Sequence, residues 1–472
     1  MPVFFSSFSF SRRVCLFSTI VFLFILSGCS SNFKSFTDSF KAAAELSKGA
    51  NVSPEYIASI PYASHLVTIN DNKPIFMVLA FADQYDKSAP HQLTWLAKDS
   101  GSIVTQHGRI VQTNGFDTNN LSGLAHSSMA RNLPLPGDAL DSPLKVTYDW
   151  SPGYRYGFTA TVETRSLGRE TLVTDLWREE AEHFTETVTF DQLDAQFTNH
   201  FWRVPATDTL PAYIIKSIQY VGPNMDRVEM QAVRPFVEPA PMAAPPSDAE
   251  RFMGKQLLLP EGGRFSLALQ DAHRQTAFWP LNDIPYPLGT ALVDLSKQPL
   301  VDQKKEQVIK QLQTLNTPAA NTLAKHLMPM HFAYHEDISH NLVQIRVKPR
   351  LDPLLNGDYW LSLPARPDHI RILHPLSENI VMMSSRADFH VSRYLAELTQ
   401  DMTSATDLPP VHSAWVIQAD RRVYPVTDLQ WRDTRYYLSP GAMVFVGLED
   451  LPHAYRDLNA NIAQLLAFRL EL

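Results

Sequence analysis

The sequence predicts two regions of different fold class: a mainly β first half, built as an antiparallel barrel or sandwich, and an α+β second half. Short runs of alternating apolar and polar residues fill the first half from Leu66 onward. Apolar residues recur at helical spacing after residue 300. A proline-rich stretch from Pro235 to Pro246 separates the two patterns. We therefore expect two differently folded regions joined by a spacer.

The chain begins with a leader that is typical of bacterial lipoproteins. Arg12 and Arg13 are followed by an apolar run, Val14–Leu26, which is shorter than the roughly 20 residues needed to cross a bilayer. Leu26-Ser27-Gly28-Cys29 then matches a lipobox. Residues 1–28 are predicted to be a signal peptide, with cleavage before Cys29 and acylation of that cysteine. An ordinary signal peptide with a chance cysteine is the alternative.

Lipidation at Cys29 predicts where the mature chain is located. Each buried CH2 of an acyl chain contributes about 0.8 kcal/mol, so several chains on one residue hold a protein firmly at a membrane. Ser30 follows the cysteine, whereas an Asp there is the usual signal for retention at the inner membrane. We expect a protein that faces the periplasm and is anchored in outer-membrane lipid through acylated Cys29.

Residues 29–53 are predicted to be a tether, because they are rich in Ser, Ala and Lys. Phe33, Phe36 and Phe40 recur at helical spacing within it, which is also compatible with a short amphipathic helix near the lipid surface. A mobile linker whose aromatic side chains pack on the first domain is the other interpretation.

Composition excludes several classes of protein. With 44% hydrophobic and 19% charged residues, the chain is typical of a globular protein. Residues 1–28 contain two arginines and no acidic residue, so 39 of the 41 basic residues face 49 acidic ones in the mature chain, and nucleic-acid binding is not expected. Cys15 lies in the leader and Cys29 is the lipid site, which leaves no disulfide or cysteine-ligated metal in the folded part.

Residues 54–235 are assigned to a single β domain. Turns such as Asn70-Asp71-Asn72 and Asp99-Ser100-Gly101 are short, so neighbouring runs must pair as antiparallel hairpins. The predicted strands are Leu66–Ile69, Ile75–Phe81, Leu93–Leu96, Ile103–Thr105, Ile110–Thr113, Tyr154–Val162, Thr185–Phe190, Phe197–Val204, Ile214–Tyr220 and Val228–Val233. Residues 236–249, with their prolines, favour an extended polyproline conformation and are predicted to be a semi-rigid linker.

The second half repeats an order of helix and short strands. Apolar residues share a helical face in two sets, Val301, Val308, Leu312 and Leu315, and later Val391, Tyr394, Leu395 and Leu398. Thr317-Pro318 begins a further helix. Extended runs are predicted at Val343–Val347, Tyr359–Leu363, Ile370–Leu373, Trp415–Gln418, Arg422–Val426 and Met443–Val446. This order fits two small α+β units, residues 250–385 and 386–456.

The last segment, residues 457–472, is predicted to be an amphipathic helix. Leu458, Ile462, Leu465 and Leu466 lie on one side of it. This face either packs on its own domain or offers a docking surface to a partner. At this modest length, packing within the chain is favoured.

A search for catalytic chemistry finds no convincing motif, and no catalytic, cofactor-binding or metal-binding residue is predicted. His335-Glu336 with His340 is similar to the zinc motif His-Glu-x-x-His, but the two histidines are five residues apart and face away from each other on a helix. His331 and His335 fit better as surface or core-edge residues of one strand. The sequence also lacks a nucleophile elbow, a phosphate loop and a dinucleotide fingerprint.

Sugar binding is more plausible, because carbohydrate sites combine aromatic faces with planar polar groups. Trp150, Tyr154, Arg155 and Tyr156 offer this mixture within seven residues, and Arg109 beside a tight turn is a further candidate. An aromatic cluster that closes a β-sheet is the favoured alternative for Trp150 and its neighbours. Four arginines of the second half are additional candidates for sugar binding, namely Arg346, Arg350, Arg366 and Arg371.

The first half resembles the YjbF/GfcB family of exopolysaccharide and group 4 capsule lipoproteins over roughly residues 20–235. The order of the matching stretches carries this resemblance more than any one of them. They are Ile60–Ser64, Trp95–Leu96, Gly108–Val111, Thr113–Gly115, Asn120–Leu121, Phe201–Trp202 and Lys216–Gln219.

The second half resembles the GfcC/YjbG family of capsule biosynthesis proteins over roughly residues 250–472. The matching stretches are Tyr286–Gly289, Ala291–Asp294, Asn356–Tyr359, Leu363–Pro367, Ser439–Ala442 and Leu458–Ala463. This resemblance implies two β-grasp-like domains, residues 250–385 and 386–456, and a C-terminal amphipathic helix. Members of the two families are normally separate proteins, so here they are expected to be fused.

Together the two resemblances imply a non-catalytic, lipid-anchored periplasmic component of exopolysaccharide or capsule biosynthesis and export. It would act as a scaffold or a glycan-binding accessory, with an outer-membrane exopolysaccharide export protein as partner and the polysaccharide as a further ligand. A carbohydrate-active enzyme, such as a glycoside hydrolase or lyase that processes the exported polymer, is the alternative. A structural lipoprotein of the envelope unrelated to polysaccharide is a third hypothesis.

Overall fold

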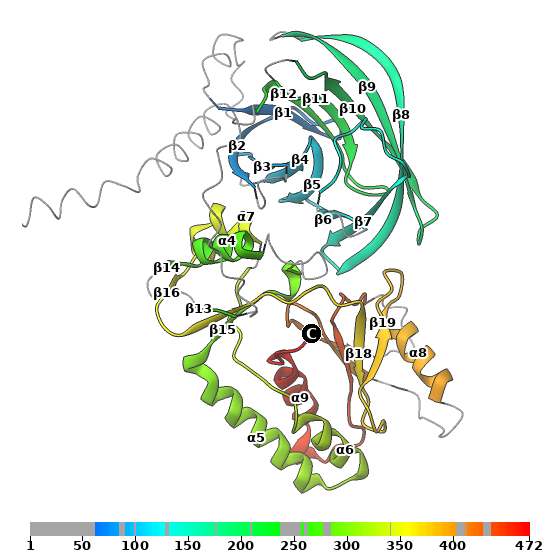
Figure 1. The fold of residues 1–472 in the computed structure, drawn as a ribbon. Helices are drawn as coiled ribbons and strands as arrows, with labels where there is room; N and C mark the ends of the chain where they lie inside the picture. Colours follow the sequence, from blue (N-terminus) through cyan, green and yellow to red (C-terminus); the bar gives the residue numbers. More distant parts are fainter. Residues whose placement is uncertain are drawn as a thin grey trace, which may run out of the picture.

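The computed structural model shows a β-barrel and a mixed α/β region that lies against one end of it (Figure 1). It describes residues 62–84, 90–98, 101–127, 132–174, 177–207, 210–236, 256–258, 263–276, 285–339, 341–402, 411, 413–427 and 436–472. The predicted leader with Cys29, the tether at 29–53 and residues 237–249 of the predicted linker lie outside the described residues. None of the helices described here is long and apolar enough to cross a membrane.

The first half forms a nearly closed antiparallel barrel of 12 strands, which confirms the mainly β prediction and selects a barrel over a sandwich. Consecutive strands pair from β1 to β5 and from β6 to β12, and β1 pairs with β12. The strands are β1 (Ser64–Ile69), β2 (Ile75–Asp83), β3 (Gln92–Leu96), β4 (Ser102–Gln106), β5 (Arg109–Asn114), β6 (Asn120–His126), β7 (Leu144–Ser151), β8 (Arg155–Val173), β9 (Arg178–Phe190), β10 (Gln196–Val204), β11 (Tyr213–Tyr220) and β12 (Arg227–Arg234).

The two edges of this sheet, β5 and β6, meet without a backbone ladder between them. Side chains bridge the seam instead. The backbone N–H of Leu121 donates a hydrogen bond to Oγ1 of Thr113 (2.9 Å), and Nε2 of Gln112 donates to the carbonyl oxygen of Ser122 (3.4 Å). Because unpaired strand edges must be protected, this polar seam is the part of the barrel where another surface is expected to dock.

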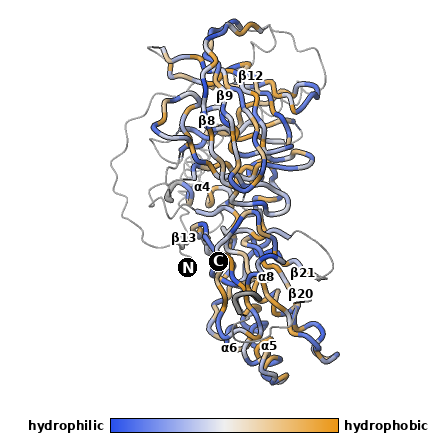
Figure 2. The backbone as a smooth tube through the Cα atoms, turned by 90° about the vertical axis from the view of Figure 1, so that its right-hand side faces the viewer, coloured by the Kyte–Doolittle hydropathy of each residue, from blue (hydrophilic) through white to orange (hydrophobic). Residues whose placement is uncertain are grey.

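Aromatic side chains fill the barrel interior. Trp95, Trp150, Phe158 and Phe201 are each at most 1% exposed, and burial of such a side chain stabilises a fold by roughly 1.5–3 kcal/mol. Buried and partly exposed residues alternate along β8 from Arg155 to Val162, because successive side chains of a strand point to opposite faces. Figure 2 shows the same alternation of hydrophobic and hydrophilic residues along the barrel strands.

The predicted strands of the first half coincide with β1–β5 and β8–β12, whereas β6 and β7 are not predicted by the sequence patterns. The register of β6 with β7 shifts between Leu121 and Gly123, and that of β7 with β8 shifts between Tyr148 and Trp150. Buried and exposed residues do not alternate regularly along either strand, so neither shows the pattern by which a half-buried strand is identified.

The second half contains short strands in three small sheets, with the orders β13-β17-β15, β14-β16 and β19-β18-β22-β20-β21. Its strands are β13 (Gln256–Leu258), β14 (Gly263–Arg264), β15 (Ala291–Asp294), β16 (Leu354–Leu355), β17 (Tyr359–Ser362), β18 (His369–Leu373), β19 (Val381–Ser384), β20 (Ser413–Ile417), β21 (Val423–Thr427) and β22 (Met443–Val446). Its helices are α4 (Phe265–Thr276), α5 (Gln298–Leu315), α6 (Pro318–Leu327), α7 (Leu342–Val347), α8 (Val391–Met402) and α9 (Leu458–Ala467), with 3-10 turns η3 (Pro287–Gly289), η4 (Leu295–Lys297), η5 (Pro349–Leu351) and η6 (His453–Tyr455).

Helix α8 covers the five-stranded sheet. Val391, Tyr394 and Leu398 of this helix pack with Ile370 of β18 and Val444 of β22, as expected from their helical spacing. The two central strands, β18 and β22, run parallel, and their neighbours pair antiparallel. The prediction of helices packed on small sheets is therefore confirmed.

Helices α5 and α6 form a hairpin that packs around α9 (Figure 1). The side chain of Thr317 accepts a hydrogen bond from the backbone N–H of Ala320 and caps α6, where the sequence predicts a helix start. Ile462 and Leu465 of α9 are fully buried together with Val308 and Leu312 of α5. The apolar face of the terminal helix thus packs within its own chain.

The prediction of an extended run at Val343–Val347 is wrong, because these residues belong to helix α7. Valine and isoleucine at alternate positions favour a strand on pattern alone. The side chain of Asn341 accepts a hydrogen bond from the backbone N–H of Gln344 and caps a helix instead. The helix then buries Leu342, Val343 and Ile345.

Candidate functional site

A polar cleft of about 1100 Å³ lies where the barrel meets the second half. Its barrel wall comes from the β5–β6 seam and from β7, and includes Gln112, Ser122 and Asp149. Its opposite wall comes from the segment before β15, from residues 334–339 and from the β20–β21 turn. Clefts of this size between two folded units, with a few convergent polar groups, are common positions for ligand sites.

An ion pair joins the two walls. The guanidinium of Arg366 binds the carboxylate of Asp149 in a bidentate manner, with Nη1–Oδ2 at 2.6 Å and Nη2–Oδ1 at 2.9 Å. Asp149 Oδ1 also accepts a hydrogen bond from the backbone N–H of Gly157 (2.7 Å), which fixes the carboxylate. Burial alone would lower the pKa of Arg366, but the Asp149 carboxylate outweighs it and raises that pKa.

Helix α7 makes a second set of contacts with the barrel. Its Arg346 binds Asp83 of β2 through both Nη atoms (2.7 and 3.1 Å), and its guanidinium lies 4.6 Å from the ring of Phe81. Asn341 Nδ2 and Gln344 Nε2 both donate to Oδ1 of Asn114 (3.0 and 3.1 Å), at the end of β5. These contacts depend on the helical spacing of Asn341 and Gln344, which a strand would place differently.

The turn between β7 and β8 provides a third set of contacts. The hydroxyl of Tyr154 donates to Oδ2 of Asp420 (2.8 Å) and lies 3.0 Å from the hydroxyl of Tyr424. Burial and the neighbouring Asp420 carboxylate raise the pKa of Tyr154. Arg155 is close to this contact, with its guanidinium 5.9 Å from the ring of Tyr437 and 5.4 Å from that of Trp150. Two of the predicted sugar-binding residues therefore lie where the halves meet.

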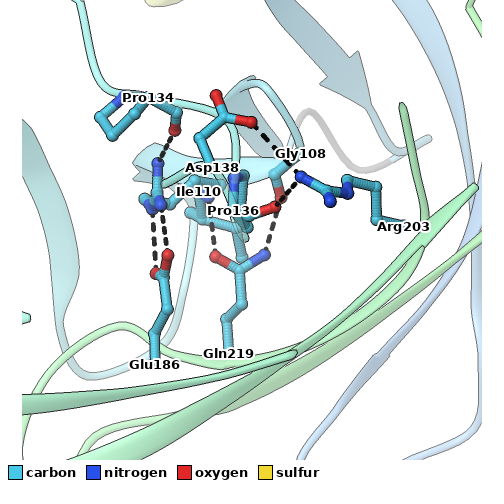
Figure 3. A network of polar contacts seen from close by, with 9 residues as sticks. Gly108, Ile110, Pro134, Pro136, Asp138, Glu186, Arg203 and Gln219 are labelled. Carbon is cyan, nitrogen blue, oxygen red and sulfur yellow. Dashed lines mark hydrogen bonds and ion pairs between the residues drawn. The ribbon is translucent and has the colours of Figure 1, made fainter. Parts of the chain in front are cut away.

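The other two predicted sugar-binding residues are buried in the barrel. Trp150 is 1% exposed, and its Nε1 donates to the carbonyl oxygen of Val221 (2.7 Å). Arg109 is 4% exposed, and its Nε and Nη2 bind Glu186 while Nη1 donates to the carbonyl oxygen of Pro134 (Figure 3). Glycan contact by Arg109, Trp150, Tyr154 and Arg155 remains a prediction.

The Arg109–Glu186 pair belongs to a polar network inside the barrel (Figure 3). Gln219 accepts a hydrogen bond from the backbone N–H of Ile110 (2.9 Å) and donates to the carbonyl oxygen of Gly108 (2.9 Å). Arg203 contacts Asp138 (3.3 Å) in the same region. The network ties the loop at residues 134–138 to β9–β11.

Of the additional arginine candidates, the structure brings Arg346 and Arg366 to the junction of the halves. Arg371 lies 3.4 Å from Glu471, and Arg350 is exposed in η5. Sequence reasoning did not select Asp149, Tyr286 or Arg421, which line the cleft. These three residues are far apart in the sequence, so no local pattern indicates that they lie close together in space. Tyr286 belongs to the stretch Tyr286–Gly289, which carries the resemblance to the GfcC/YjbG family.

The histidines considered as metal ligands lie in different environments. His335 lines the cleft, and its Nε2 is 3.2 Å from the carbonyl oxygen of Arg469, whereas His331 is exposed. Glu336 pairs with Lys297, and His340 lies outside the described residues. Within the described ranges, no three His, Cys, Asp or Glu side chains are grouped closely enough to hold a metal ion.

Two family models match the chain. Residues 34–233 match the family described as group 4 capsule polysaccharide lipoprotein gfcB, YjbF, and residues 380–471 match the family described as capsule biosynthesis GfcC C-terminal. The first match covers the barrel strands up to β12, and the second covers β19–β22, α8 and α9 but not β18.

Three curated proteins of Escherichia coli strain K12 are similar to parts of the chain. The uncharacterized lipoprotein GfcB is 26% identical over 47% of this chain and 97% of its own length. The uncharacterized lipoprotein YjbF is 32% identical over 22% of this chain and 48% of its own length. The uncharacterized protein YjbG is 24% identical over 48% of this chain and 86% of its own length.

A solved structure, that of the hypothetical lipoprotein YmcC from Escherichia coli K12, is 25% identical to this chain. It aligns with a TM-score of 0.33 over 43% of this chain and 96% of the solved chain. The two family matches and the similarities to GfcB and YjbG confirm the resemblances found in the sequence. The chain combines an N-terminal region of the YjbF/GfcB group 4 capsule lipoprotein family with a C-terminal region of the GfcC capsule biosynthesis family.

Proposed function

We propose that this protein is a non-catalytic, lipid-anchored accessory of capsule or exopolysaccharide assembly, in which a barrel and a second module act as one unit. The observation that carries the proposal is the docked junction. Asp149–Arg366, Asp83–Arg346 and Tyr154–Asp420 tie the two halves at three separate places, and Asp149, Arg366 and Asp420 also line the cleft. Bidentate pairs of this kind fix orientation as well as distance, which suits a scaffold that presents a defined surface.

The proposed location is the outer membrane, on its periplasmic side. The lipobox at Cys29 and the lipoprotein names of the relatives GfcB and YjbF support a lipid anchor. The residue after the cysteine, Ser30, supports the outer rather than the inner membrane. In this position the protein would contact an outer-membrane export protein and the polysaccharide. Fusion holds both modules at one anchor and at high effective concentration.

We further propose a β-grasp-like arrangement for the five-stranded sheet. A first hairpin, β18–β19, is followed by α8 and then by β20, β21 and β22, and the first and last of these strands pair in parallel at the centre. In the proposed division of the second half, this unit therefore includes residues from His369 onward, rather than beginning at residue 386. The small sheet of β13, β17 and β15 would form the core of the unit that precedes it.

The cleft favours binding over catalysis. Asp149 is held by Arg366, Glu336 by Lys297, and Asp420 by Tyr154, so three of the four carboxylates that line the cleft are engaged in structural contacts, and only the exposed Asp337 is left without such a contact among the described residues. A glycosidase needs two carboxyl groups placed on either side of a scissile bond, one of them free to transfer a proton. We therefore propose a glycan-binding or scaffolding role rather than a hydrolase or lyase.

The experiment that tests this function compares cells that lack the gene with cells that carry the wild-type protein or the Cys29→Ala variant. Loss of surface polysaccharide without the gene, rescue by the wild type and failure of a soluble Cys29→Ala variant are the expected results. In parallel, purified wild-type protein is expected to leave the chain length of the isolated polymer unchanged. Shortening of the polymer would support the enzyme, and normal surface polymer without the gene would contradict both functions.

A further inference from the structure

Buried polar atoms without partners gather on one wall of the cleft. Nε and Nη2 of Arg421 and Nδ1 of His335 are buried and have no hydrogen-bond partner in the described part of the chain, and the hydroxyl of Tyr286 is buried with Ser439 as its neighbour. Arg421, His335 and Tyr286 line the cleft. A buried polar group without a partner costs about 1–3 kcal/mol, so several at one place call for a physical reason.

Arg109 shows which kind of group binds the Nε and Nη2 edge of an arginine in this protein. Arg109 binds the carboxylate of Glu186 through Nε and Nη2, the edge of a guanidinium that offers two parallel N–H groups. In Arg421 the other nitrogen, Nη1, donates to the carbonyl oxygens of Gly289 and Ala419, both at 3.1 Å. The two-donor edge of Arg421 therefore lacks the carboxylate that Arg109 has.

The charges around Arg421 favour an anion. Arg469 is fully buried nearby, and its Nη2 shares the carbonyl oxygen of Gln418 with the backbone N–H of Arg421 (3.5 and 3.0 Å). Arg469 bonds only to carbonyl oxygens, and among the described residues neither arginine has a carboxylate within ion-pair distance. Burial lowers the pKa of Arg421 to about 10 and that of Arg469 to about 9, so both stay charged at neutral pH.

His335 adds an acceptor beside these donors. A carbonyl oxygen can only accept a hydrogen bond, so the 3.2 Å contact between Nε2 of His335 and the carbonyl oxygen of Arg469 places the proton on Nε2. Burial lowers the pKa of His335 to about 3, so the ring is neutral and Nδ1 is left as an acceptor. A ligand hydroxyl can donate to this nitrogen, and the Tyr286 hydroxyl can donate or accept.

We infer that Arg421, His335 and Tyr286 form a binding site for a sugar acid, a ligand that carries a carboxylate and neighbouring hydroxyl groups. The carboxylate occupies the two-donor edge of Arg421, and hydroxyls of the ring contact Nδ1 of His335 and the Tyr286 hydroxyl. An inorganic anion without a hydroxyl, such as sulfate, satisfies Arg421 but leaves the acceptor of His335 unused. The inference rests on the proposed function, because it names acidic glycan residues as the ligand of the cleft.

The test uses the full-length protein in detergent micelles and saturation-transfer NMR with galacturonate and glucuronate. Their methyl esters and the neutral sugars galactose and glucose serve as ligand controls. The expected result is saturation transfer to the two acids, with affinities about tenfold higher than for the esters. Equal signals from acids and esters, or no signal from either acid, would overturn the site. Displacement of the acids by an equal concentration of sulfate would show a simple anion site and also contradict it.

Variants separate the roles of charge and geometry. Arg421 has a φ of 68°, a left-handed conformation that glycine adopts without strain, so Arg421→Gly removes the side chain while the turn keeps its favoured backbone. This variant and Arg421→Lys, which keeps the charge but lacks the fork, are both expected to lose about tenfold in affinity. Tyr286→Phe removes only the hydroxyl and is expected to weaken binding severalfold. Unchanged affinity in Arg421→Gly would contradict the assignment.

Arg456→Gln is the matched control, because it makes the same charge change as a neutral substitution of Arg421 at an exposed position outside the cleft. It is expected to bind the acids as the wild type does. If wild-type protein rescues surface polysaccharide in cells but binds neither acid, this inference fails while the proposed function stands. If deletion leaves surface polysaccharide unchanged, the proposed function fails on its own evidence.

Discussion

Asp149 of the barrel and Arg366 of the second half form a bidentate ion pair although 217 residues separate them in the sequence. Asp149 lies at a bulge of β7, and Arg366 follows the strand β17 at the start of the five-stranded region. With Asp83–Arg346 and Tyr154–Asp420, this pair holds the two regions in one orientation. The contribution of these contacts to the stability of the docked state can be measured.

Removal of one partner of the Asp149–Arg366 pair is expected to loosen the junction. Asp149→Asn and Arg366→Gln should each destabilise the docked state by about 1–2 kcal/mol, at the modest end because the Arg366 side chain is 34% exposed. Limited proteolysis of the linker region and thermal unfolding measure the effect. A double-mutant cycle is expected to give a coupling energy above zero, and strictly additive effects would argue against a direct interaction.

Arg346 is expected to contribute more than Arg366 to the stability of the docked state. The side chains of Arg346 and Asp83 are only 10% and 14% exposed, and Phe81 lies under the guanidinium. Arg346→Ala should cost about 2–4 kcal/mol in the docked state. Arg350→Ala removes an exposed arginine shortly after the same helix and should change stability by less than about 0.5 kcal/mol. Similar urea midpoints for the two variants would contradict this role of α7.

The buried Arg109–Glu186 pair should be costly to break on one side only. Glu186→Gln is expected to destabilise the barrel by about 3–5 kcal/mol, because it leaves the Arg109 charge buried without a carboxylate (side chains 4% and 3% exposed). The double variant Arg109→Met with Glu186→Leu should be less destabilised than either single one, since it removes both charges. Chemical unfolding followed by tryptophan fluorescence can check this, because Trp95 and Trp150 lie in the barrel core. A double variant that is less stable than both single variants would contradict this prediction.

His65 should make stability depend on pH. Burial lowers its pKa to about 3, and its ring packs edge-on against Trp95 at 4.2 Å. The unfolded chain takes up a proton near pH 6.5 that the folded barrel does not, so the stabilisation is complete above about pH 6.5 and is lost as the pH falls toward 3. His65→Phe keeps an aromatic ring and should flatten the pH dependence of the unfolding temperature in this range. An unchanged slope would show that other groups dominate it.

Local patterns predicted the regular parts of the fold well. Strands with strict alternation, such as Val228–Val233 within β12, and helices with a clear apolar face, such as α8, are present where the sequence indicates. The β6 and β7 strands escaped prediction because buried and exposed residues do not alternate regularly along them. The prediction for Val343–Val347 is wrong because alternating β-branched residues match a strand pattern, whereas the cap formed by Asn341 begins a helix.

The candidate site was harder to predict than the fold. Tyr154 and Arg155 were selected for sugar chemistry, and the structure places them at the junction of the two halves. The cleft itself is built from Asp149, His335, Arg421 and other residues that come together only through the docking of two regions. No local spacing encodes that docking, because it depends on long-range ion pairs and on the capping of α7.

Surface polysaccharide in cells that carry a charge exchange across the junction tests most directly whether the docked arrangement is needed for function. The gene is replaced by Asp149→Arg, by Arg366→Asp or by the double exchange, and membrane levels of each variant are matched by immunoblot. Each single variant places like charges together and is expected to reduce surface polymer, whereas the double exchange is expected to restore it. Wild-type amounts of polymer with both single variants, under conditions where proteolysis shows an opened junction, would contradict a functional role for the docking of the two halves.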